Sequence, residues 1–297
     1  MKLKIALQAA ATLGLVVLFA TGPAVAQDLR GTLKKIKDSG EIAVGYRDSS
    51  PPFSFTDAST STPGGPRAIG YSIDLCLKIA DSIQKKLGMN ALRVKWVAVT
   101  PDTRIPSVVN GTIDLECGSS SNTLTRQEQV DFSHLTFVDG GGLLVKVGSA
   151  YVQLADLAGK RIGVIPGTTT EKALSEALRK ERITAQVVAV KEHGEGRTAL
   201  DAGTIDAYAS DRALLIGLIL TSPDPSRFGL SDVFLSYEPY GFMLRRDDSA
   251  FRLEVNRALS EIYRSGDIAA IYQKWFGAFV KPGPLLLAMY LLQSLPE

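Results

Sequence analysis

The chain has 297 residues, of which 33 are Lys or Arg and 31 are Asp or Glu. Such an even balance leaves no basic surplus for a nucleic-acid backbone, and we do not expect nucleic acid as a partner. The two histidines, His134 and His193, are far apart in sequence and have few acidic or cysteine neighbours, so neither a metal site nor a cofactor is expected.

The N-terminal 26 residues have the pattern of a secretory signal peptide. Lys2 and Lys4 precede an apolar run over residues 5–20, and Ala24-Val25-Ala26 supplies an A-x-A cleavage site after Ala26. The alternative is a membrane anchor, but the run is shorter than the roughly 20 residues that a spanning helix needs. We expect export to the periplasm and a mature chain of zero formal charge, because cleavage removes two basic residues and no acidic ones.

After residue 26, strand-like and helix-like patterns alternate almost throughout. Alternating apolar residues predict strands, and apolar residues three or four apart predict helices. The expected strands are residues 41–46, 92–99, 112–117, 161–165, 185–190 and 205–209. The expected helices are residues 71–87, 123–129, 169–181, 194–201, 211–220, 249–265 and 267–276. This alternation predicts an α/β fold in which helices cover mostly parallel sheets.

The length of the chain favours two lobes over a single sheet. The joint is expected at residues 138–142, where three consecutive glycines permit a bend, and residues 238–241 have the pattern of a return crossing. The predicted organisation is lobe 1 over residues 27–139, lobe 2 over 140–241, and a return to lobe 1 over 242–297. The return ends in an apolar segment, 285–292, that we expect to pack on the body of the protein.

Two loops are expected to face each other across the cleft between these lobes. Residues 118–122 are rich in serine and precede a helix that carries Arg126, whereas residues 166–171 place Thr168 and Glu171 at the spacing of a capping box. Hydroxyls and N–H groups at helix starts bind anions, and an arginine holds a carboxylate with two hydrogen bonds. The alternative is a pair of ordinary helix caps with a surface arginine. Neither loop has the Gly-Lys-Ser/Thr of a nucleotide P-loop.

Several short motifs follow one another through most of the chain. They are Gly45-Tyr46-Arg47-Asp48-Ser49-Ser50-Pro51-Pro52-Phe53-Ser54, Gly70-Tyr71-Ser72-Ile73-Asp74-Leu75, Thr103-Arg104-Ile105-Pro106, Asn110-Gly111-Thr112-Ile113-Asp114, Glu116-Cys117-Gly118-Ser119, Gly167-Thr168-Thr169, Tyr240-Gly241 and Lys274-Trp275-Phe276. In order and spacing, the set resembles the periplasmic solute-binding proteins of polar amino acid ABC transporters (family 3), and most closely their glutamate/aspartate-binding branch. The resemblance implies a type II periplasmic binding protein fold with two hinge strands, a monomer without catalytic residues, and an inner-membrane permease as partner.

The resemblance also implies roles for particular residues. Arg126 would hold the α-carboxylate of the ligand, and Asp211 would hold its α-ammonium. The further ligand-binding residues that it implies are Ser119, Ser121, Thr168 and Thr169 as hydrogen-bond donors, and Arg47, Arg104 and His193 for a side-chain carboxylate. Where the family often has a serine, this chain has Pro101, so one hydroxyl contact is lost and the preference between glutamate and aspartate stays open.

The charges of these residues also favour an acidic ligand. Three arginines against one aspartate leave two positive charges that a dicarboxylate neutralises and a neutral amino acid does not. We therefore expect glutamate or aspartate to bind about tenfold to several hundredfold more tightly than glutamine. The alternative for Arg47 or Arg104 is a solvated surface charge.

Three further alternatives are left open by the sequence. Cys76 and Cys117 form either a disulfide within lobe 1 or two buried thiols. Some periplasmic cyclohexadienyl dehydratases resemble the chain in fold and early motifs, although such an enzyme needs a general acid and an apolar ring pocket that the expected residues do not provide. A sensor that presents its closed form to a membrane chemoreceptor would use the same ligand chemistry as a transport protein.

Overall fold

The computed structural model describes residues 29–62, 65–149, 151, 153–277 and 280–297. The expected signal peptide, residues 1–26, lies outside this part of the chain. Within it, the helices are all too short or too polar to cross a membrane.

Strands and helices alternate along the chain. The strands are β1 (Glu41–Tyr46), β2 (Ser49–Ser50), β3 (Ser54–Thr62), β4 (Gly65–Ile69), β5 (Arg93–Ala98), β6 (Leu115–Glu116), β7 (Asp131–Lys146), β8 (Arg161–Val164), β9 (Gln186–Ala189), β10 (Ala207–Asp211), β11 (Phe228–Leu230) and β12 (Ser236–Leu244). The helices are α1 (Gly31–Ser39), α2 (Tyr71–Lys86), α3 (Arg104–Val109), α4 (Leu124–Gln127), α5 (Thr169–Glu181), α6 (His193–Ala202), α7 (Arg212–Leu220), α8 (Ser249–Ser265), α9 (Asp267–Trp275) and α10 (Pro284–Leu292), with short 3₁₀ turns at Leu154–Leu157 and Pro225–Arg227.

One long sheet runs through the molecule in the strand order β5-β1-β6-β12-β7-β10-β8-β9. At one end β1 pairs in parallel with β5 and β6, and at the other end β8 pairs in parallel with β10 and β9. Between these two parallel parts, β7 and β12 pair antiparallel with each other and with their outer neighbours. The sheet is therefore parallel at both ends and antiparallel where the two ends join.

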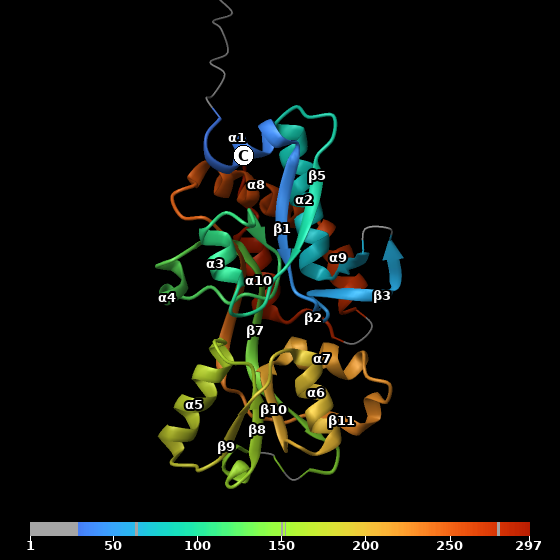
Figure 1. Cartoon of the computed structure of the whole chain (residues 1–297), viewed down its shortest axis with the longest axis vertical. Coiled ribbons are helices and arrows are strands. Elements are labelled where there is room, and N and C mark those ends of the chain that lie inside the picture. Colours follow the sequence, from blue (N-terminus) through green and yellow to red (C-terminus); the bar gives the residue numbers. More distant parts are fainter. Residues whose placement is uncertain (1–28, 63–64, 150, 152, 278–279) are drawn as a thin grey trace, which may run out of the picture.

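Figure 1 shows two bodies that are connected along β7 and β12. In the first body, which we call lobe 1, α2, α8, α9 and α10 bury one apolar core against the sheet. In the second body, lobe 2, α5 packs on one face of the sheet and α6 and α7 pack on the other, because Leu174 and Leu178 belong to one core and Leu200 and Leu215 to another. The expected two-lobed α/β fold with two connecting strands is confirmed.

The glycine run at residues 140–142 is not a bend, and this expectation was wrong. All three residues lie inside β7, where Gly140 pairs with Tyr237 and Gly141 with Ser236. A Cβ on Gly140 would come within 2.2 Å of the Phe234 ring, and a Cβ on Gly142 within 2.9 Å of the Arg212 side chain. These glycines make room for neighbouring side chains, and the strand continues from one lobe into the other.

Two expected elements around the Ser-rich loop are shorter than the sequence suggested. The strand over residues 112–117 is reduced to β6, because the backbone N–H and hydroxyl of Thr112 both donate to the Asn110 side chain and hold a turn there. The helix over residues 123–129 is reduced to the four residues of α4, since the chain must extend again for β7.

Other expectations hold closely. α5 and α8 have the predicted bounds, and the apolar C-terminal segment forms α10, whose Leu286, Met289 and Tyr290 are buried in the lobe 1 core. The C-terminal segment therefore packs on lobe 1, as expected.

Candidate functional site

A narrow cavity lies where the two lobes meet. Its lining includes every residue that the sequence predicted for the ligand: Arg47, Arg104, Ser119, Ser121, Arg126, Thr168, Thr169, His193 and Asp211. The structure adds Ile165, Thr170, Tyr208, Ala209, Ser210 and Leu214 to the lining. Residues far apart in sequence thus meet in one polar space.

The three arginines reach the cavity from different elements of lobe 1. Arg47 follows β1, Arg104 is the first residue of α3, and Arg126 lies in α4. Their exposed fractions are only 2%, 4% and 9%, so none of them is a solvated surface charge. Burial lowers the pKa of Arg104 to about 9, and the nearby positive charge of Arg126 acts in the same direction.

Hydrogen bonds fix two of these guanidinium groups. Arg104 Nη1 donates to Ser120 Oγ at 2.8 Å, and Ser120 Oγ in turn donates to Glu116 Oε2 at 2.8 Å. Arg126 Nη1 donates to the carbonyl of Ser121 at 2.8 Å. Because α4 has only four residues, Arg126 itself, rather than a helix N-terminus, is the positive group of this loop.

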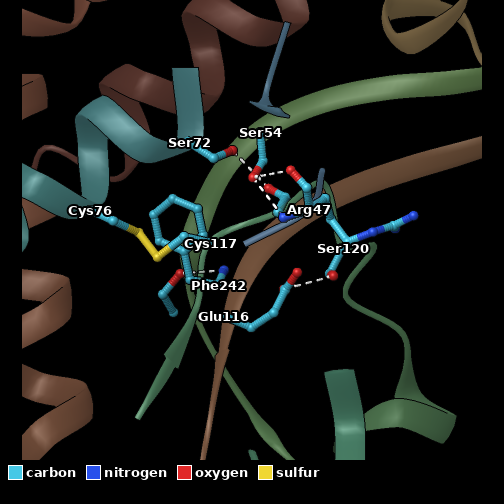
Figure 2. The surroundings of a disulfide bond; sticks show 10 residues. Arg47, Ser54, Ser72, Cys76, Glu116, Cys117, Ser120 and Phe242 are labelled. Atoms are coloured by element: carbon cyan, nitrogen blue, oxygen red, sulfur yellow. Dashed lines mark hydrogen bonds between the residues drawn. A yellow bond between two sulfur atoms is a disulfide. The ribbon is translucent and has the colours of Figure 1, made fainter. Parts of the chain in front are cut away.

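A disulfide anchors the same loop to the body of lobe 1 (Figure 2). Cys76 of α2 is bonded to Cys117, which follows β6, so the structure contains the disulfide and not two thiols. Ser72 Oγ also donates to the carbonyl of Gly118 at 2.7 Å, and the N–H of Cys117 donates to the carbonyl of Gly45 at 2.8 Å. The loop that carries Ser119 and Ser121 is therefore held to α2 and to β1.

On the side of lobe 2, α5 begins at the cavity. Thr168 is its N-cap, and its Oγ1 accepts a hydrogen bond from the N–H of Glu171 at 3.1 Å, as the sequence predicted. The Glu171 carboxylate accepts from the N–H of Gly167 at 2.8 Å instead of from Thr168, one residue earlier than in a standard capping box.

His193, at the start of α6, is buried and accepts or donates through Nδ1, which lies 2.7 Å from the Tyr208 hydroxyl. Burial, together with the positive charges of Arg47 and Arg104, holds the pKa of His193 well below its usual range. The imidazole is therefore neutral at pH 7, and it offers the cavity a hydrogen-bonding ring nitrogen rather than a charge.

Asp211 precedes α7 and is held from two sides. Its Oδ1 accepts from Thr170 Oγ1 at 2.6 Å, and its Oδ2 accepts from the Tyr240 hydroxyl. Burial, followed by the negative charge of Glu238, raises the pKa of Asp211 to about 6. Within the described part of the chain Asp211 forms no ion pair, although the charge of Arg126 acts on it, so its carboxylate is available to a cation in the cavity.

Three acidic residues at the site were not expected from the sequence. Glu192 accepts from Arg47 Nη2 at 2.6 Å, and Glu238 accepts from Thr169 at 2.7 Å and from Ser121. Glu116, fully buried, lies behind Ser120. The expected excess of two positive charges was therefore wrong, because Asp211 in the lining and three glutamates around the cavity accompany the three guanidinium groups. The one available signal was a glutamate inside the expected strand over residues 112–117.

Among the described residues, no cluster of three or more His, Cys, Asp or Glu side chains has the arrangement of a metal site. The cavity instead consists of fixed guanidinium groups, hydroxyls and one acceptor carboxylate. A polar cavity enclosed between two lobes, with two strands joining them, defines a two-lobed small-molecule binding protein.

Comparison with known proteins identifies the family. The chain belongs to the bacterial extracellular solute-binding proteins, family 3, whose family model matches residues 42–278.

Two relatives and one solved structure illustrate the similarity. The L-glutamate/L-aspartate-binding protein of Pseudomonas aeruginosa is 39% identical over 277 residues, which covers 93% of this chain and 90% of the relative. The glutamate/aspartate import solute-binding protein of Escherichia coli is 35% identical over 251 residues, 84% of this chain and 81% of the relative. An ancestral amino acid-binding protein, a precursor of cyclohexadienyl dehydratase, superposes with a TM-score of 0.70 at 28% identity, covering 83% of this chain and all of that one.

Proposed function

We propose that the protein binds an acidic L-amino acid, glutamate or aspartate, between its lobes and delivers it to an ABC permease in the inner membrane. The observation that carries this proposal is the meeting of three buried arginines from one lobe with Asp211 and His193 from the other in a single cavity. The names of the two relatives, both glutamate/aspartate-binding proteins, support the same ligand class.

In this proposal each end of the ligand has its own partners. Arg126 holds the α-carboxylate, with Ser119, Ser121, Thr168 and Thr169 as further donors. Asp211 holds the α-ammonium, because its carboxylate has only neutral hydroxyl partners, Thr170 and Tyr240. Arg47, Arg104 and His193 hold the side-chain carboxylate.

Unpaired donors, rather than an excess of charge, support the choice of an acidic side chain. The Nε–H groups of Arg47 and Arg104 are buried and have no hydrogen-bond partner within the described part of the protein. Leaving a buried donor unpaired costs roughly 1–3 kcal/mol. A ligand carboxylate that accepts from either group removes this cost, whereas a neutral side-chain amide does so with a weaker bond.

The mechanism that we propose is closure of the lobes about β7 and β12. Residues 27–139 and 242–297 would move as one body, and residues 140–241 as the other. Ligand would dock first on Arg47, Arg104 and Arg126, and closure would then bring Thr168, His193 and Asp211 onto it. The binding energy available for closure is the difference in affinity between the closed and open forms.

We also propose that the protein acts as a monomer in the periplasm after cleavage following Ala26. The family is extracellular by its description, which supports an exported protein. The closed form would be the one that the permease recognises.

Catalysis is a second possibility because one structural neighbour is a precursor of cyclohexadienyl dehydratase. We propose that this chain is not an enzyme, since its cavity is lined by arginines and hydroxyls and Leu214 and Ile165 provide little apolar surface for a ring. Formation of an aromatic product from prephenate or arogenate would show that this proposal is wrong.

Isothermal titration calorimetry of the mature protein with a panel of amino acids tests the ligand class. L-Glutamate or L-aspartate should bind most tightly, with L-glutamine weaker by about tenfold or more. Tighter binding of glutamine or arginine than of glutamate would refute the proposed ligand.

A further inference from the structure

Glu116 is a buried carboxylate for which ligand binding provides no role. It lies on β6 with no exposed surface, and Figure 2 shows its side chain directed toward Ser120, next to the Cys76–Cys117 disulfide. Glu116 Oε2 accepts the Ser120 hydroxyl at 2.8 Å, whereas Glu116 Oε1 has no hydrogen-bond partner within the described part of the chain. Glu116 does not line the cavity.

The surroundings of Glu116 are the same three arginines that line the cavity. Ser120 connects its carboxylate to Arg104, and the charges of Arg104, Arg47 and Arg126 all act on it. Gly118 makes this approach possible, because a Cβ there would lie 2.2 Å from Glu116 Oε1 and 3.3 Å from Arg47 Cγ. Glu116 is therefore the fixed negative charge behind the arginines.

A carboxylate in this place is costly. Burial raises the pKa of Glu116 although three arginines and the Ser120 hydroxyl act to lower it. Buried ion pairs of this kind often stabilise a fold less than apolar residues of similar volume. Stability therefore does not explain a carboxylate at this position. The effect of the carboxylate on the charge of the site does explain it.

We propose that Glu116 is a specificity-determining residue whose negative charge limits how strongly the arginines prefer a ligand with two carboxylates over a ligand with one. The charge of Glu116 repels the second carboxylate of the ligand through the low-dielectric wall of the cavity, while Ser120 keeps Arg104 in place. This inference rests on the proposed function, because it deepens the account of how the acidic ligand is selected.

The test is the Glu116→Gln variant, which keeps the size of the side chain and an acceptor for Ser120 but removes the charge. The readout is the ratio of the dissociation constants for L-glutamine and L-glutamate, measured by calorimetry at pH 7.5. The ratio should rise by about tenfold, the order expected when one charge behind the Arg104 guanidinium is removed from a buried site. An unchanged or lower ratio in a folded variant would overturn the proposal.

Two matched variants separate charge from packing. Glu254→Gln removes another buried glutamate, 7% exposed and paired with Arg257 in α8, and should leave the ratio unchanged. Ser120→Ala breaks the connection to Arg104 but keeps the Glu116 charge, and it should not raise the ratio. A rise with Ser120→Ala as large as that with Glu116→Gln would mean that the hydroxyl, and not the charge, sets the preference.

Two further measurements test the proposal if Glu116→Gln does not fold or if the wild-type protein does not prefer an acidic ligand. If circular dichroism shows that Glu116→Gln does not fold, Glu116→Asp replaces it; a wild-type ratio then supports the role of charge, and a raised ratio overturns it. If the wild-type protein prefers a neutral or basic amino acid, the proposed function fails. Glu116→Gln is then tested with L-lysine against L-glutamine, where loss of the negative charge must weaken binding of the cation selectively.

Discussion

Glu192 of lobe 2 is bonded to Arg47 of lobe 1, with 2.6 Å between Glu192 Oε2 and Arg47 Nη2. The same oxygen accepts the Ser49 hydroxyl at 2.9 Å. Glu192 occupies the N-cap position of α6, yet its side chain makes no cap bond to that helix. Its carboxylate instead joins the two lobes beside the cavity, and in the closure proposed above this bond would form only when the lobes come together.

We predict that Glu192→Gln speeds ligand release. In the proposed closure the bond to Arg47 would stabilise only the closed form, and partly buried ion pairs of this kind contribute on the order of 1 kcal/mol. The dissociation rate should therefore rise about three- to tenfold, with a nearly unchanged association rate, in stopped-flow measurements. Glu176→Gln, which removes an exposed charge from α5 of the same lobe, is the control. Tighter binding of glutamate by Glu192→Gln would instead show that Glu192 competes with the ligand for Arg47.

Arg126 and Arg104 should differ in which ligands they affect. Arg126→Gln removes the proposed partner of the α-carboxylate, which every amino acid carries, and should weaken glutamate and glutamine alike by about a hundredfold. Arg104→Gln should weaken the binding of glutamate by a similar factor and the binding of glutamine by much less. Calorimetry with both ligands on both variants measures this. Equal losses of glutamate and glutamine affinity in Arg104→Gln would contradict the assignment of Arg104 to the side-chain carboxylate.

Ligand affinity should fall in acid. The pKa of Asp211 is raised to about 6, so its carboxylate becomes protonated as the pH falls through 6 and no longer attracts the α-ammonium. Between pH 7.5 and pH 5 the affinity for glutamate should drop roughly tenfold, because the side-chain carboxylate of the ligand, with an ordinary pKa near 4.3, stays mostly ionised over this interval.

Two variants locate the group that titrates. Asp211→Asn should bind weakly at every pH and lose this dependence. Asp139, whose pKa burial raises to about 7, accepts the N–H of Ala213 at 2.8 Å and does not line the cavity. Asp139→Asn should therefore keep the pH dependence of glutamate affinity. If this variant loses it, the group that titrates is Asp139 and not Asp211.

Reduction of the Cys76–Cys117 disulfide should destabilise the protein. The bond closes a loop between residues 41 positions apart, for which restriction of the unfolded chain is worth about 3–4 kcal/mol. Guanidinium unfolding of the Cys76→Ser/Cys117→Ser variant should show a loss of this size. Glutamate affinity should also fall, because the loop after Cys117 carries Ser119 and Ser121. A variant with wild-type affinity would show that Ser72 and the strand bonds hold this loop without the disulfide.

Local signals in the sequence were enough for the bounds of several elements, and the resemblance to a known family was needed for the residues of the predicted site. The bounds of α5 and α8 follow from their apolar periodicity and their caps, since both depend on residues within a few positions. The nine ligand residues were implied by the resemblance to the family, and all nine line one cavity. They lie at the ends of strands and the starts of helices, where the order of elements along the chain brings side chains to one edge of a sheet.

The tertiary structure decided the contacts between residues that are far apart in sequence. The partners of Arg47 and Ser121 are Glu192 and Glu238, which are 145 and 117 positions away, so no local spacing marks them, and the count of site charges made without them was wrong. The glycines at residues 140–142 predict a bend only because glycine permits one. Packing of Phe234 and Arg212 against them gives the physical reason for a continuous strand instead.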